Sequence, residues 1–80
     1  MKKTLVAAAE LEQWLTAKLR KLDDCHDCKV SGVLPLQEPD EQGCNWSDSL
    51  VVNAGGLPYD YYAKFLSVVV AEARSRFNLK

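Results

Sequence analysis

Residues 58–77 constrain the fold of this 80-residue chain most, because their apolar positions repeat with helical spacing over a broad arc. The central stripe comprises Tyr62, Leu66, Val69 and Ala73. One flank comprises Tyr59, Val70 and Phe77, and the other comprises Tyr61, Phe65 and Val68. At one residue per 100° this arc covers roughly 200°, wider than the ≳100° stripe of a typical surface helix. The segment therefore predicts a helix with more apolar surface than one layer of a small protein covers.

Start and stop signals bound this helix at both ends. Pro58 suits the first helical position, and Asp60 suits the positive N-terminal end of the helix dipole. Arg74 and Arg76 lie in the expected last turn, and Asn78 is a suitable left-handed terminator. We expect a helix over residues 58–77.

A first helix is predicted over residues 5–22. Leu11, Leu15, Leu19 and Leu22 fall on one stripe, and the hydroxyl of Thr4 can cap the N-terminus. The acidic residues that follow are unfavourable at a helix C-terminus, so the helix is expected to end near Leu22.

Two strands are predicted between the helices, over residues 29–37 and 44–53. In the first strand one side comprises Val30, Gly32, Leu34 and Leu36 and the other Lys29, Ser31, Val33 and Pro35. In the second strand one side comprises Trp46, Leu50 and Val52 and the other Ser47, Ser49 and Val51. Pro35 cannot donate to a ladder, which places it at an edge or near a strand end. The turn-forming residues 38–43 between the strands favour an antiparallel hairpin.

The element order predicts an α+β fold for a single domain over residues 1–80. The expected arrangement has two layers, helix-strand-strand-helix (αββα), with both helices on one face of the hairpin. A two-stranded hairpin is marginal in water, and a domain this short buries only about 60–65% of its unfolded surface. Both deficits favour a second copy of the chain.

We therefore expect a homodimer, with Tyr61, Phe65 and Val68 near its interface. Symmetric twofold dimers are the commonest soluble oligomers. Either the hairpins pair edge to edge into a four-stranded sheet, or the second helices pack together. The alternative is a monomer in which the first helix lies across the second and covers the extra apolar arc.

The three cysteines leave several chemistries open. Cys25 and Cys28 have the spacing of a metal-binding or redox pair, and Cys44 is a candidate third ligand. A fourth zinc ligand is missing, because the one histidine, His26, lies between the first two thiols. The pair also follows a helix C-terminus among acidic residues, a setting that disfavours a reactive thiolate. Inert loop cysteines, a metal site and a thiol switch all remain open.

Charge argues against a dedicated nucleic-acid-binding protein. The net charge is −1, and residues 22–60 carry eight acids and one base. Nucleic-acid binders usually carry a dense basic stripe. A weaker nucleic-acid alternative uses the basic helix ends, namely Lys18, Arg20, Lys21, Arg74 and Arg76.

The N-terminus predicts a cytoplasmic protein. The apolar run after the two lysines stops at Ala9, shorter than the usual signal-peptide core of about 7–15 residues. No run is long enough to span a membrane, so no membrane partner is expected.

The sequence contains no phosphate-binding glycine loop and no Ser-His-Asp order, so no catalytic residues and no cofactor are expected. It therefore predicts a non-catalytic protein-interaction module that binds itself and an unidentified protein. A metal-binding or thiol-switch protein using the cysteines is the main alternative.

Overall fold

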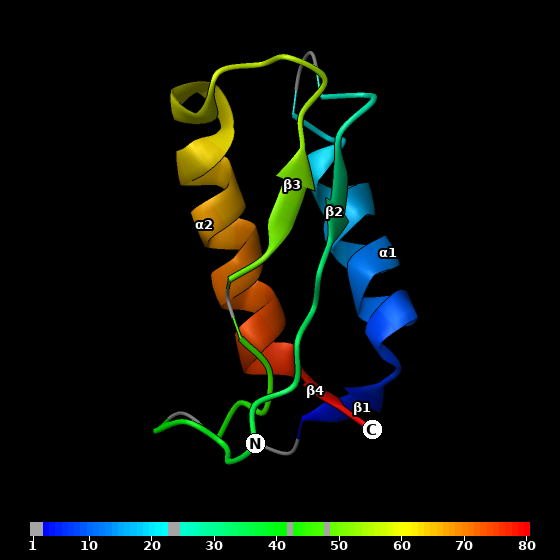
Figure 1. Ribbon diagram of the computed structural model, residues 1–80, viewed down its shortest axis with the longest axis vertical. Coiled ribbons are helices and arrows are strands. Elements are labelled where there is room, and N and C mark those ends of the chain that lie inside the picture. The colour runs from blue at the N-terminus through cyan, green and yellow to red at the C-terminus, as the bar shows by residue number, and fades with distance from the viewer. Residues whose placement is uncertain (1–2, 23–24, 42, 48) are drawn as a thin grey trace.

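A computed structural model describes residues 3–22, 25–41, 43–47 and 49–80. The α+β class is confirmed, and the described residues form two helices and two small sheets (Figure 1). The elements are, in chain order, β1 (Thr4–Val6), α1 (Ala8–Leu19), β2 (Lys29–Ser31), β3 (Val51–Asn53), α2 (Tyr59–Arg76) and β4 (Phe77–Leu79).

The two terminal strands were not predicted, and they shorten both helices. β1 pairs in parallel with β4, in the register Thr4↔Phe77, Leu5↔Asn78 and Val6↔Leu79. The predicted role of Thr4 as a helix cap is therefore wrong. The cap position of α1 belongs to Ala7, whose backbone N–H lies 3.4 Å from the Glu10 carboxylate.

The predicted ends of both helices are also corrected. α1 ends at Leu19 rather than Leu22, and α2 runs over Tyr59–Arg76 rather than 58–77. Pro58 is the cap residue of α2 and not its first helical residue. Phe77 and Asn78 continue directly into β4 in extended conformation, so Asn78 is not a left-handed terminator.

The hairpin is shorter than predicted. Of residues 29–37 only Lys29–Ser31 are regular strand, and of residues 44–53 only Val51–Asn53. Gly32 has a positive φ of 76° and ends β2. Beyond it, one isolated antiparallel bridge joins Pro35 to Trp46. Asp48, which falls within the predicted strand over residues 44–53, lies outside the described residues.

One apolar cluster joins the elements. α1 contributes the predicted stripe of Leu11, Leu15 and Leu19, all fully buried. From α2 come Tyr62, Val69 and Ala73, and from the hairpin region Val30, Val33 and Trp46, with the three cysteines completing the buried set. In the hairpin, Val30 and Val52 point toward this cluster, whereas Lys29, Val51 and Asn53 are exposed. This alternation is typical of an antiparallel sheet that packs one face on the core and exposes the other to solvent.

Candidate interaction surface

The residues predicted to form an interface lie together on the outer side of α2. We call Tyr61, Phe65 and Val68 the α2 face. Val68 is 66% exposed and Tyr61 is 44% exposed. Phe65 is half-buried and packs partly against the core. The monomer therefore leaves much of this predicted surface in water, and α1 does not cover Tyr61 or Val68.

The opposite side of α2 anchors the helix. Tyr62, Val69 and Ala73 are buried, and α2 packs against α1 and β4. Tyr59 adds an edge-to-face contact with Tyr62, with ring centroids 5.6 Å apart. The α2 face is thus displayed by a helix that is held in place on its other side.

The two edges of the hairpin differ in whether their backbone groups can pair with another strand. The Val30 N–H donates to the Thr16 hydroxyl at 2.9 Å, and that hydroxyl lies 3.3 Å from the Val30 carbonyl oxygen. On the same side, the Glu12 carboxylate accepts the Val33 N–H and Arg20 donates to the Cys28 carbonyl. Side chains of α1 and of its C-cap residue Arg20 therefore occupy the outer edge of β2.

The outer edge of β3 is open by comparison. Val30 opposes Val52 in the ladder. Because the backbone of Val30 points toward α1, this is a non-hydrogen-bonded pair, and the N–H and C=O of Val52 point away from β2. Within the described residues no hydrogen bond from another element reaches Val52. Val51, beside it, is 61% exposed.

Cys25 and Cys28 lie in a loop, as predicted, and Cys44, predicted to begin a strand, also lies outside regular structure. All three are buried in the apolar cluster. Cys25, Cys28 and Cys44 are free thiols, each no more than 1% exposed. A tight turn joins the first two, with the Cys28 N–H donating to the Cys25 carbonyl. The Cys44 thiol lies 3.7 Å from the Trp46 carbonyl oxygen. Among the described residues, no three histidine, cysteine or acidic side chains gather as a metal site.

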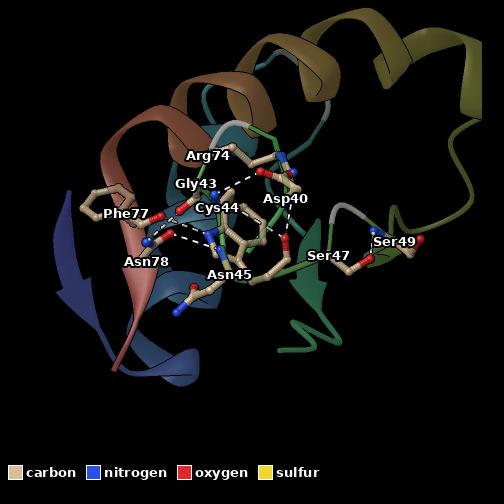
Figure 2. Close-up of polar contacts among 10 residues, drawn as sticks. Asp40, Gly43, Cys44, Asn45, Ser47, Ser49, Arg74, Phe77 and Asn78 are labelled. Carbon is tan, nitrogen blue, oxygen red and sulfur yellow. Dashed lines mark hydrogen bonds and ion pairs between the residues drawn. The ribbon is translucent and has the colours of Figure 1, made fainter. Parts of the chain in front are cut away.

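A polar network around Arg74 was not predicted from the sequence (Figure 2). The Arg74 guanidinium forms an ion pair with Asp40 and donates to the Trp46 carbonyl at 2.6 Å. It also lies 5.5 Å from the centre of the Trp46 ring. The indole N–H of Trp46 donates to the Phe77 carbonyl at 3.0 Å. The network therefore ties the loop before β3 to the end of α2.

Two asparagines extend this network to the C-terminal strand. The side chain of Asn45 donates to the Leu79 carbonyl and accepts the Leu79 N–H. Asn78 accepts the Asn45 N–H and donates to the Gly43 carbonyl. The one feature of the sequence that could have indicated the Arg74 network is Trp46, because a buried indole N–H requires a hydrogen-bond acceptor.

Most basic residues of the nucleic-acid alternative already have partners within the chain. Arg74 lies in the network above, and Arg20 binds a backbone carbonyl. Lys18 lies 5.1 Å from the centre of the Trp14 ring, and Arg76 pairs with Glu72 at 3.1 Å. Four of the five basic side chains therefore have a contact within the chain that requires no phosphate partner.

A small pocket lies between α1 and the β1–β4 pair. It has a volume of about 140 Å³ and is lined by Val6, Glu10, Leu11, Trp14 and Phe77. Pockets that bury a drug-sized ligand measure about 300–1,000 Å³. This pocket is smaller than that range and lies beside the Trp14–Phe77 aromatic contact.

No protein-family model matches the chain, and neither curated proteins nor solved structures gave a match. Neither α1 nor α2 combines the length and apolar character needed to cross a bilayer.

Proposed function

We propose that this protein is a non-catalytic interaction module that acts as a homodimer through the α2 face. The observation that carries the proposal is the exposure of Val68 (66%) and Tyr61 (44%) on a helix otherwise anchored in the core. Exposed aromatic and aliphatic side chains grouped on one element favour a protein partner.

The exposed area is large enough to matter in a chain of this size. Complete burial of a valine side chain stabilises by roughly 1.5 kcal/mol, at the lower end of the aliphatic range. Two-thirds of that, about 1 kcal/mol, is still available from Val68 in each copy. Tyr61 and the open part of Phe65 add to it, and the twofold axis doubles the total.

The hairpin offers a second dimer geometry, a four-stranded sheet formed edge to edge. Since Thr16, Glu12 and Arg20 occupy the outer edge of β2, such a sheet is restricted to the β3 edge at Val52. We favour the helix geometry because it removes Tyr61 and Val68 from water, whereas strand pairing has no requirement to do so. Within each copy we propose the αββα arrangement, with both helices on the hairpin face that carries Val30 and Val52.

A dilution series tests the proposal. Light scattering after gel filtration, from about 100 µM downward, is expected to give twice the chain mass of 8.9 kDa at the upper end. A mass that stays at 8.9 kDa over the whole series would exclude the homodimer.

We propose that the acidic segment 22–60 also contacts a second, unidentified protein. Its eight acids and one base favour a basic partner. Three free thiols are compatible with a reducing compartment, so we place this binding in the cytoplasm. Capture from extract with wild type and with Lys29→Glu, which makes the segment more acidic, tests the sign of the partner's charge. If the amount of captured partner does not fall as the salt concentration rises, a charged contact is contradicted.

A further inference from the structure

We infer that two α2 helices pair antiparallel about a twofold axis beside Val68, with Lys64 of each copy opposite Glu72 of the other. This inference rests on the proposed function, because it specifies the register of the same dimer. It is carried by the order of charges along α2.

The charges follow one row of the helix surface. Asp60, Lys64, Val68, Glu72 and Arg76 are spaced by four residues, so they form a continuous ridge. Asp60, Lys64, Val68 and Arg76 are exposed, and the Glu72 side chain is 41% exposed. Read along the chain, the ridge is acid, base, valine, acid, base.

That order is complementary to itself when reversed. A twofold axis at position 68 places Lys64 against Glu72 of the second copy, and Asp60 against Arg76. Both pairings join opposite charges, and each occurs twice. A parallel pair in the same register would place like charges side by side. The ridge therefore specifies an antiparallel partner, and this chain itself supplies one.

Helix geometry separates the inner pair from the outer pair. Four residues advance the ridge by about 40° around the helix and about 6 Å along it. Lys64 and Glu72 thus lie about 40° to either side of Val68 and face the partner, whereas Asp60 and Arg76 lie about 80° away at the rim. The inner pair is the one that fixes the register.

The neighbouring rows fit this packing. On one side of the ridge lie the small, exposed residues Ser67, Ala71 and Ser75, which form a groove for the partner's ridge. On the other side lie Tyr61 and Phe65, which the crossing helix would cover. The proposed contact thus combines an apolar centre with a charged rim, as interfaces do.

Charge reversal tests the register in both directions. Lys64→Glu and Glu72→Lys each create two like-charge pairs in a homodimer, and each is expected to weaken self-association roughly tenfold. Mixing the two variants restores both opposite-charge pairs, so heterodimers should form with near wild-type affinity. With one of the two variants labelled uniformly with ¹⁵N, native mass spectrometry resolves the three dimers by mass.

Matched controls place the same charge changes off the helix. Lys21→Glu and Glu38→Lys alter exposed residues far from α2 in sequence and should leave the dimer affinity within about twofold. Circular dichroism on all variants separates loss of pairing from loss of helix, which matters because Glu72→Lys also removes the ion pair with Arg76.

A cross-link provides a second measurement that is independent of charge. The axis beside Val68 brings its two Cα atoms within the range of about 4.4–6.8 Å that a disulfide requires. Val68→Cys should therefore form a covalent dimer under mild oxidation. Ser75→Cys should not, because two copies of residue 75 lie about 21 Å apart along the paired helices. The native thiols are buried and leave the background low.

The outcomes separate the register from the proposed function. Selective heterodimers and a Val68→Cys cross-link support both. A wild-type dimer that ignores the charge reversals and does not cross-link overturns the register but leaves the interaction module intact. A wild-type monomer at 100 µM overturns both.

Discussion

Val68→Asp is the substitution that separates an interaction role from a purely structural role of α2. Val68 is 66% exposed in the monomer, so its replacement removes little internal packing. We expect the unfolding free energy of the monomer to change by less than about 0.5 kcal/mol, as for other surface substitutions. In the dimer each copy loses about 1 kcal/mol of apolar burial, and the two new carboxylates face each other. A loss of at least about 2 kcal/mol corresponds to a dissociation constant raised roughly thirtyfold.

The matched control is Val51→Asp. Val51 is the same residue type with nearly the same exposure, 61%, but it lies on the outer face of β3. Sedimentation equilibrium on wild type and both variants gives the three dissociation constants directly. The reasoning is refuted if Val68→Asp dimerises like wild type, or if Val51→Asp weakens the dimer as much as Val68→Asp does.

Three further predictions concern the fold and its chemistry. Thr16→Val keeps the side-chain shape but removes the hydroxyl that pairs with the N–H and the carbonyl of Val30. We expect the unfolding free energy measured in urea to fall by about 1–3 kcal/mol and the Val30 amide to exchange faster. Unchanged exchange would show that water replaces the hydroxyl without cost. Trp46→Phe removes the indole donor to the Phe77 carbonyl, so we expect the unfolding free energy to fall by about 1–3 kcal/mol. Hydrogen exchange should show earlier fraying of the C-terminal strand. An unfolding free energy within about 0.3 kcal/mol of wild type would contradict this role of Trp46. Chelation should leave the thermal midpoint unchanged and release less than about 0.1 equivalent of zinc, because the three thiols are packed in the core. Stoichiometric zinc in untagged protein would contradict this prediction and support the metal-binding alternative.

The helices were the predictable part of this fold, because their signals are local. The Leu11–Leu15–Leu19 stripe of α1 and the Tyr62–Val69–Ala73 stripe of α2 follow from spacing alone, and both are buried. The helix ends were less predictable. Thr4 reads as a cap, yet it pairs with Phe77 in a parallel ladder at the other end of the chain. A three-residue strand leaves no periodicity from which such a pairing can be read.

The cysteines illustrate a second limit of sequence reasoning. Their polar, acidic neighbours predict a loop exposed to water, and the loop around His26 and Asp27 is exposed. The thiols themselves turn inward and fill the core as small apolar groups, a common role of free cysteine. Composition of a loop therefore did not predict the direction of its side chains.

The breadth of the apolar arc predicts an interface with Tyr61, Phe65 and Val68 from the sequence alone. The structure shows Tyr61 and Val68 exposed, whereas the order of the charges around Val68 was not predicted. The charged ridge that surrounds Val68 becomes informative only once the helix is placed, because only then is it known which residues of the ridge face water. The Arg74 network forms where the loop before β3, the end of α2 and β4 meet, and spacing along a single element does not predict such a meeting.

The molar mass of the wild-type protein as a function of concentration tests the central claim most directly. Sedimentation equilibrium at several concentrations up to 100 µM is expected to follow a monomer–dimer equilibrium that approaches twice 8.9 kDa, and Val68→Asp is expected to shift that equilibrium toward monomer. A wild-type mass that remains 8.9 kDa at every concentration would contradict the account, because the exposed side of α2 would then have no second copy to cover it.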